Sequence, residues 1–252
     1  MATVTAVILT YNEENHIQAC IESAQFADSI IVFDSYSLDA TVELAKAAGV
    51  EVIQHPFDNY MQQRNAALDA VRGRTDYVIF IDADERVTPE LAEEVRTVIE
   101  TQPQIAGWQI PRHNIIFGKL TRGGGWYPDY QTRLLKVDAA RYDPSRKVHE
   151  IVLLDGPLGT LRSHLTHYNY DSPAQFAAKQ RKYTAYEAAT LHARGIRPKP
   201  QNYILQPLRH FRWRFFALKG YRDGLHGLRL SLLMAWYEFK KYVMLRELCR
   251  DD

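Results

Sequence analysis

Apolar runs and helical patterns alternate through the first hundred residues of the chain. Four runs rich in β-branched and apolar residues occupy positions 4–10, 30–33, 50–53 and 77–81. Runs of this length are typical of buried parallel strands. Apolar residues spaced three and four apart, together with capping signals, predict helices over 17–24, 41–48 and 61–71 and from Thr88 onward. The alternation predicts an α/β fold whose mainly parallel sheet is flanked by helices on both faces.

The pattern changes in the rest of the chain. Residues 107–136 are rich in aromatic, glycine and basic residues, and short strands are expected at 108–111, 132–137 and 151–154. From Pro173 the pattern is helical, with breaks at Pro198 and Pro200, and it ends in an apolar stripe of Leu225, Leu228, Leu232, Trp236, Phe239 and Val243. We therefore expect a domain over residues 1–170 and a helical C-terminal region over residues 171–252.

The composition is that of an ordinary globular protein. The 252 residues are 46% apolar and 24% charged, with 13 Gly and 11 Pro, which excludes disordered and collagen-like chains. Cys20 and Cys249 allow neither a disulfide framework nor a cysteine zinc cluster, which suits a reducing compartment. No signal peptide and no membrane-spanning run is recognisable. A cytoplasmic location is expected.

Charge is distributed unevenly along the chain. The total of +1 combines a net charge of −12 over residues 1–100, +5 over residues 101–191 and +8 over residues 192–252. A basic C-terminal region is expected where a protein meets an anionic partner, either nucleic acid or a membrane surface. Solvated helix faces are the alternative explanation.

The most specific chemical signal follows the fourth apolar run. Asp82, Asp84 and Glu85 place three carboxylates within four residues at the end of a predicted strand. Clustered carboxylates repel one another unless a cation or hydrogen bonds compensate, so the segment is a candidate site for a hard divalent metal that bridges phosphate oxygens. The alternative is a helix N-terminus with acidic residues in its first turn.

Four segments resemble glycosyltransferase family 2, the inverting enzymes of the GT-A fold. They are the segment from Val7 to Glu14, the segment from Phe33 to Thr41, the segment from Gln63 to Leu68, and the Asp82-Ala83-Asp84 motif. Later segments, among them Trp126 to Asp129, Val148 to Glu150 and His167-Tyr168, are similar to the branch that contains lipopolysaccharide core β-glucosyltransferases. The chain departs from the family pattern at Tyr36, where a glycine is usual, and at Leu38 and Ala67.

The resemblance implies a nucleotide-sugar donor site in residues 1–100 and an acceptor half in residues 101–170. By position, Thr10, Tyr11 and Glu13 would hold the nucleoside, and Asp34 would accept from the uracil imide N–H. Arg64 offers a guanidinium fork for the diphosphate. Asp82 would support the ribose or the metal. The alternative for Tyr11 is an aromatic residue packed at the rim of the fold, and the alternative for Arg64 is an arginine on the surface of a helix.

The resemblance also implies the catalytic groups. Asp84, with support from Asp82 and His167, would bind a divalent Mg²⁺ or Mn²⁺. Glu150 would be the base that takes the acceptor hydroxyl proton, with Asp129 as the second candidate. The alternative for His167 is a purely structural role. The alternative for Glu150 is a carboxylate at the edge of a strand, paired with Arg146 or Lys147.

The function implied is transfer of a hexose from a UDP-sugar such as UDP-glucose to lipopolysaccharide core or another lipid-linked saccharide. Aromatic and basic residues interleave from His210 to Arg222, which suits an anionic membrane surface. We therefore expect a peripheral enzyme on the inner face of the cytoplasmic membrane, without a nucleic-acid partner. Packing of this region on the catalytic domain or on a second subunit is the alternative.

Three rival functions remain for comparison. A sugar nucleotidyltransferase shares the metal-binding α/β sheet but needs a glycine-rich basic loop after the first strand, where this chain has Tyr11 to Glu14. A dinucleotide enzyme needs a Gly-x-Gly-x-x-Gly segment, which is missing. A non-catalytic scaffold of the same fold would not need Asp82, Asp84 and Glu150. The sequence leaves the sugar, the acceptor and the oligomeric state open.

Overall fold

The computed structural model describes residues 1–143 and 151–250. The chain divides into two compact units. The first unit comprises Met1–Arg112 and Asp129–His167, and the second comprises His113–Pro128 and Tyr168–Asp252. The segment His113–Pro128 thus belongs with the C-terminal helices, in contrast to a single boundary at residue 170. The division of function between residues 1–170 and 171–252 stays a prediction.

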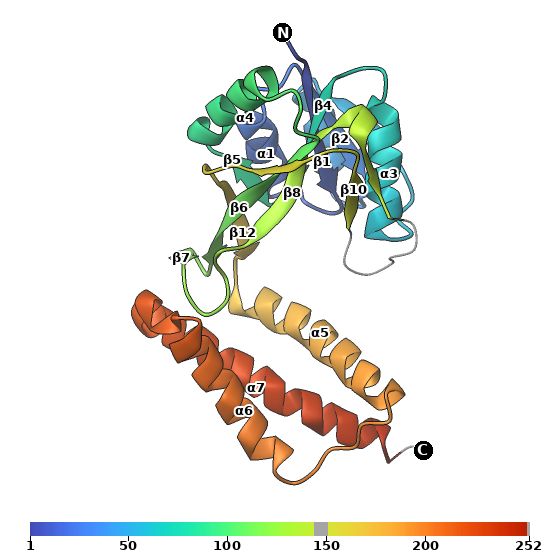
Figure 1. Cartoon of the computed structure of the whole chain (residues 1–252). Helices are drawn as coiled ribbons and strands as arrows, with labels where there is room; N and C mark the ends of the chain where they lie inside the picture. The colour runs from blue at the N-terminus through green and yellow to red at the C-terminus, as the bar shows by residue number, and fades with distance from the viewer. Residues whose placement is uncertain (144–150, 251–252) are drawn as a thin grey trace. The chain divides into compact units, whose positions relative to one another are not determined.

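The first unit is an α/β structure (Figure 1). Its strands, of which β6 and β12 continue into the second unit, are β1 (Val4–Thr10), β2 (Ser29–Asp34), β3 (Glu51–Gln54), β4 (Tyr77–Asp82), β5 (Glu85–Val87), β6 (Gly107–Ile116), β8 (Tyr130–Lys136), β9 (Ala140–Tyr142), β10 (Val152–Leu154), β11 (Leu158–Thr160) and β12 (Leu165–Tyr170). Its helices are α1 (Ile17–Ser23), α2 (Thr41–Ala47), α3 (Tyr60–Val71), α4 (Pro89–Thr101) and the 3₁₀ turn Val137–Ala139.

The sheet is parallel in its first half and antiparallel beyond it. Its order is β3-β2-β1-β4-β8-β6-β12-β5, and β1 pairs in parallel with both β2 and β4. Strand β8 then pairs antiparallel with β4 and β6, and β9 and β10 form a separate hairpin. The predicted α/β fold with a mainly parallel sheet, helices on both faces and a helical C-terminal region is confirmed.

Successive residues of each central strand face opposite sides of the sheet, which explains the continuous apolar runs. Ile8 and Ile79 pack with α1 and α4 in one buried cluster, whereas Val7 and Phe80 pack with α3 in another. In Figure 1, α1 and α4 lie on one side of these strands and α3 on the other. Both faces are therefore covered, and only the ends of the strands are left for polar chemistry.

The carboxyl ends of three parallel strands meet at one edge of the sheet. Thr10 of β1 is in register with Asp34 of β2, and Leu9 of β1 is in register with Asp82 of β4. Ligands of open α/β sheets bind at this edge. The register therefore brings together polar residues that are more than seventy positions apart in the sequence.

The second unit contains β7 (Lys119–Thr121), α5 (Pro173–Ala193), α6 (Asn202–Arg212), the π-helical turn Trp213–Ala217, the 3₁₀ turn Gly220–Asp223 and α7 (Gly224–Leu248). Its buried core is small and consists of Ile116, Tyr170, Phe176 and Leu230. The Asp223 carboxylate accepts hydrogen bonds from the backbone N–H groups of Arg122 and Gly123, which ties the segment His113–Pro128 to the start of α7. None of the described helices is long and apolar enough to cross a membrane.

Helix α7 packs through small residues together with Leu230 and Leu245. Gly227, Ser231 and Ala235 are buried, and a Cβ on Gly227 would lie 1.9 Å from the carbonyl oxygen of Gly220. The large residues of the predicted apolar stripe lie on the opposite face, where Leu225, Leu232 and Trp236 are 84%, 53% and 52% exposed. The periodicity predicted the helix correctly, but the apolar stripe is largely not the buried face.

Candidate active site

The loops that follow β1 and β2 are fastened to each other. The Asn12 side-chain oxygen accepts from the Leu38 N–H at 2.8 Å, and the Asn12 N–H donates to the Ser37 hydroxyl at 2.8 Å. The Glu13 N–H donates to the Thr41 hydroxyl at 2.8 Å. These bonds fix the backbone around the carboxyl ends of β1 and β2 before any ligand binds, so ligand binding there costs little ordering of the loops.

Both loops contain a residue in the left-handed region. Asn12 has φ 55° and Tyr36 has φ 60°. Asparagine tolerates this region, whereas tyrosine adopts it at a cost of about 1–2 kcal/mol because its Cβ approaches the following carbonyl. The family that the chain resembles usually has a glycine at the Tyr36 position, and glycine reaches this region without that cost. Tyr36 adopts the left-handed conformation that a glycine would adopt freely.

The predicted nucleoside residues lie at this edge of the sheet. Thr10 is buried, and its hydroxyl has no hydrogen-bond partner among the described residues. Asp34 is fully buried and accepts hydrogen bonds from the Ser37 N–H at 2.9 Å and from the Gln54 side chain at 3.0 Å. Tyr11 is 54% exposed, so one ring face is available to a base. Glu13 is partly buried beside Thr41.

Asp82 lies between two buried guanidinium groups. Arg64 of α3 donates to its carboxylate at 3.2 Å, and Arg133 of β8 donates to both of its oxygens. Arg133 also donates to Glu85 at 3.0 Å, and Glu85 accepts from the Asp82 N–H at 2.9 Å. Antiparallel pairing of β8 with β4 brings Arg133 to the Asp82 end of the sheet.

The charges of this network stabilise one another. Burial alone would raise the pKa of Asp82, but the Arg133 and Arg64 guanidiniums outweigh it and hold that pKa well below its usual range. Burial opposes the charge on Arg133, and Asp82 and Glu85 overcome it, so the pKa of Arg133 is raised. Asp82 therefore stays ionised at neutral pH, with its charge compensated by arginines.

Asp84 has a different neighbour. His167 Nε2 lies 3.3 Å from the Asp84 carboxylate, and the two side chains are 8% and 24% exposed respectively. The pair arises because β5 and β12 run antiparallel with Glu85 opposite His167. One carboxylate and one imidazole therefore meet where β5 and β12 pair.

The residue set fits a divalent ion that is shared with a ligand. In residues 1–143 and 151–250, no three His, Cys, Asp or Glu side chains converge as a metal site. Mg²⁺ and similar ions are commonly held by one or two carboxylates together with substrate phosphates and water. Carboxylate and water oxygens suit Mg²⁺ and Mn²⁺, and an imidazole nitrogen suits other first-row transition metals such as iron, nickel and zinc. Asp84 and His167 are therefore suited to supply the protein part of such a site.

Asp129 is engaged by Arg112. Arg112 donates to one Asp129 oxygen at 2.9 and 2.7 Å, and Gln131 donates to the other at 2.9 Å. Arg112 also donates to Glu85 at 3.1 Å, which links Asp129 to the network around Asp82. Three arginines thus alternate with three carboxylates. Glu150, the other predicted base, lies outside the described residues.

A cavity of about 340 Å³ adjoins the network within the first unit. Arg64, Arg133 and Tyr142 line its polar part, and Ile151, Val152, Leu154 and Leu158 line its apolar part. Ile151 directly follows Glu150 in the sequence. The cavity combines guanidinium, phenol and apolar surface, and apolar lining with a few polar groups is typical of small-molecule sites.

Sequence reasoning did not identify the roles of Arg112 and Arg133, and it treated Glu85 only as a third carboxylate. Local sequence around these residues gives no signal, because their partners lie on other strands. The available clue was the excess of clustered carboxylates, since buried carboxylates require cationic partners. Sequence reasoning also did not identify the packing of Gly123 against the backbone of Lys219, where a Cβ would lie 2.3 Å from the carbonyl oxygen.

Comparison with known sequences gives a consistent result. The family described as "Glycosyl transferase family 2" matches residues 5–147. The chain is 29% identical over 247 residues to the lipopolysaccharide core biosynthesis glycosyltransferase LpsC of Rhizobium meliloti, covering 94% of this chain and 89% of that protein. It is 27% identical over 259 residues to an uncharacterized glycosyltransferase of Rickettsia bellii, covering 97% and 86% of the two chains.

Comparison with solved structures supports the fold. Glucosyl-3-phosphoglycerate synthase from Mycobacterium tuberculosis, solved with Mn²⁺, UDP and glucosyl-3-phosphoglycerate, is similar with a TM-score of 0.50 and 19% identity. The similarity covers 79% of this chain and 82% of that one. At this identity the similarity concerns the fold alone.

Proposed function

The chain belongs to glycosyltransferase family 2 and has the GT-A fold, and we propose that it transfers a hexose from a UDP-sugar to a lipopolysaccharide core or another lipid-linked saccharide. The pairing of Asp84 with His167 beside the arginine-compensated Asp82 is the observation that carries this proposal. A relative named for lipopolysaccharide core biosynthesis supports the acceptor class, and the UDP in the structure of similar fold supports the donor class.

Donor binding is proposed at the edge formed by β1, β2 and β4. Tyr11 would stack on the uracil, and Asp34 would accept from its imide N–H, since a carboxylate has further lone pairs beyond the bonds from Ser37 and Gln54. Thr10 contributes a buried hydroxyl that lacks a partner among the described residues. Glu13 would contact the ribose from the fastened loop after β1.

The leaving diphosphate needs positive charge. A divalent ion held by Asp84 and His167, with Asp82 nearby, would supply electrophilic stabilisation to the diphosphate when bound. Arg64 would add a guanidinium to the same charge, because it lies against Asp82 and over the ring of Phe80 at 5.4 Å, which fixes its position. The two carboxylates thereby have separate tasks: Asp82 orients arginines, and Asp84 binds metal.

Transfer is proposed as a single in-line displacement. The acceptor hydroxyl oxygen bonds to the anomeric carbon while the bond from that carbon to the diphosphate oxygen breaks, and the hydroxyl proton passes to a carboxylate. Glu150 is proposed as that carboxylate. Asp129 is the second candidate, although Arg112 and Gln131 engage both of its oxygens, which favours a role in holding Arg112.

A transfer assay tests the function. The purified chain is incubated with each UDP-hexose, manganese or magnesium, and deacylated lipopolysaccharide core oligosaccharide, and the product is followed by mass spectrometry. We expect a mass increase of one hexose that is abolished by a chelator. Absence of any product or UDP release with every UDP-sugar, in the presence of either metal, would contradict the proposal.

The base is tested by two isosteric changes. Glu150→Gln is expected to retain UDP binding and to lower turnover by ~10²–10⁴-fold, the usual worth of general-base assistance. Asp129→Asn serves as the matched comparison and is expected to lower turnover less. If Asp129→Asn shows the large loss and Glu150→Gln does not, the base is Asp129.

A further inference from the structure

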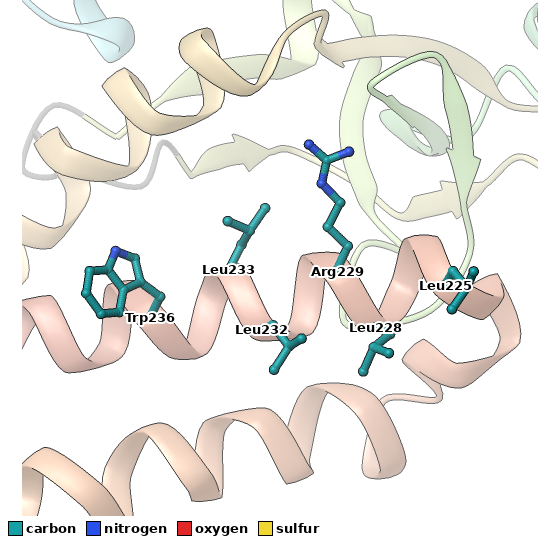
Figure 2. Close-up of a pocket in the computed structure, with 6 residues that line it drawn as sticks. All are labelled: Leu225, Leu228, Arg229, Leu232, Leu233 and Trp236. Atoms are coloured by element: carbon teal, nitrogen blue, oxygen red, sulfur yellow. The ribbon is translucent and has the colours of Figure 1, made fainter.

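Helix α7 presents an unpacked apolar face on the second unit. Figure 2 shows Leu228 and Leu232 projecting from the same side of α7, with Leu225 and Trp236 farther along the helix in either direction. These four residues are here called the α7 outer face, and with Arg229 and Leu233 they line a shallow groove of about 380 Å³. The opposite side of α7 carries its buried residues, so the outer face is not needed for packing within the unit.

The neighbouring helix has the same character. Helix α6 buries none of its residues, and Ile204 and Leu208 are 71% and 52% exposed. The turn after it exposes Trp213 and Phe216, which line a second shallow groove with Arg212 and Ala217. Exposed apolar side chains gathered on two neighbouring helices are typical of an interaction site in a folded protein.

The charge around this surface is strongly positive. The second unit carries 18 basic and 7 acidic side chains. Arg209, Arg212 and Arg222 are exposed, and the Lys240 ammonium lies over the Trp236 ring at 5.1 Å. Three of the seven acidic side chains are committed elsewhere: Glu238 and Glu187 pair with Lys241, and Asp223 accepts from the backbone N–H groups of Arg122 and Gly123.

From this combination we infer that α6 and α7 bind the surface of a bilayer containing anionic phospholipid, with the α7 outer face inserted among the acyl chains and the arginines at the headgroups. The aliphatic residues suit acyl chains, whereas bound nucleic acid requires mainly aromatic surfaces on which bases stack. A second copy of the chain would place like charges opposite one another. The surface is argued from the second unit alone; only its use for a lipid-linked acceptor rests on the proposed function.

Vesicle co-sedimentation of the full chain tests the inference. Vesicles of phosphatidylethanolamine and phosphatidylglycerol are compared with vesicles of phosphatidylcholine at low and high salt. We expect binding to the anionic vesicles, weakened but not abolished by salt, because the apolar contribution is not screened. Leu232→Ser and Trp236→Ser are each expected to lower the partition coefficient roughly tenfold, and Arg209→Gln with Arg212→Gln about fivefold for each charge.

Helix α5 offers matched controls. Tyr186→Ser removes an exposed aromatic residue, and Arg181→Gln with Lys182→Gln removes two exposed charges from the same unit. These variants are expected to sediment like the unchanged chain. Circular dichroism spectra and thermal unfolding temperatures identify any variant that has lost its fold.

Three results would overturn the inference. The unchanged chain could remain in the supernatant with anionic vesicles at low salt, the α5 controls could lose as much binding as the α7 variants, or ultracentrifugation could show a dimer that Leu232→Ser dissociates. The last result would assign the α7 outer face to a second copy. UDP release measured without vesicles is expected to be equal in all these variants, so failure here is distinguishable from failure of the proposed transferase activity.

Discussion

The first unit carries 13 basic and 23 acidic side chains, whereas the second carries 18 and 7. Several charged groups of the first unit are buried, among them Arg133, which is 3% exposed, and Glu85, which is fully buried. In the second unit the arginines of α6 are exposed, and so are Leu225, Leu232 and Trp236 of α7. The first unit thus compensates its buried charges within itself, while the second leaves both charge and apolar surface exposed to a partner outside it.

This contrast separates two ways in which a fold uses unfavourable groups. A buried ion network costs desolvation and is tolerated where it fixes the position of reacting groups, here Asp82 beside Asp84. Exposure of an apolar face to water is unfavourable and is tolerated where a partner covers that face. Each prediction below perturbs one side of the contrast.

The largest expected change in stability comes from the buried network. Arg133→Met leaves Asp82 and Glu85 without their shared cation, and breaking a buried pair in this way costs about 3–5 kcal/mol. Arg74→Gln is the matched control, since the Arg74–Glu51 pair is nearly half exposed and is worth about 1 kcal/mol or less. Urea unfolding followed by circular dichroism measures both. Equal losses in the two variants would show that burial of the network is not what makes it important.

A smaller change is expected from the close backbone contact in the second unit. Gly123→Ala places a Cβ 2.3 Å from the Lys219 carbonyl oxygen, and overpacking of this kind costs about 1–3 kcal/mol. Three of the four tryptophans, at positions 126, 213 and 236, belong to this unit, so tryptophan fluorescence during urea unfolding reports its stability. An unchanged midpoint would mean that the triglycine segment moves away without cost.

The smallest expected effect is a difference in pH dependence between the units. Burial lowers the pKa of His210, and Arg214, which donates to His210 Nε2 at 2.7 Å, lowers it further. The unfolded chain then takes up a proton as the pH falls below about 6.5 while the folded chain resists it, so stability of the second unit declines on acidification from pH 7 to about 5.

The first unit should behave differently. The depressed pKa of Asp82 contributes stability that is present above about pH 4, the unfolded value, and is lost only as the pH falls below it.

A variant of the second unit tests the difference. His210→Gln is expected to reduce the decline between pH 7 and pH 5 in the fluorescence-detected unfolding midpoint. A decline of unchanged slope would contradict the role of His210; His226, whose pKa is also lowered by burial, accounts for the part that remains.

The local sequence predicted the helices and strands of the first hundred residues, because the spacing of their apolar residues decides them. Strands β1 to β4 and the helices between them follow from apolar runs and spacing, and they lie within a few residues of the predicted bounds. The resemblance to glycosyltransferase family 2 assigned Thr10, Asp34 and Asp82 to one donor site, and the register of β1, β2 and β4 brings these three residues to one edge of the sheet.

What the sequence did not predict depends on contacts between distant segments. The partnership of Arg133 with Asp82 requires the antiparallel placement of β8 beside β4, and the Asp84–His167 pair requires the antiparallel placement of β12 beside β5. The buried face of α7 is chosen by the close approach of Gly227 to Gly220, which an apolar periodicity does not encode. Periodicity shows that a face is apolar, and packing decides whether that face is covered.

The proposed mechanism depends most on Asp84 and His167 as the protein ligands of a metal ion that binds the diphosphate of UDP. Isothermal titration of UDP into the full chain with manganese, and again with excess chelator, measures this dependence directly. We expect UDP to bind with manganese, and to bind at least roughly tenfold more weakly with chelator or in Asp84→Asn, while Asp84→Asn keeps its unfolding midpoint. UDP binding of unchanged affinity in the chelated protein and in Asp84→Asn would contradict the account.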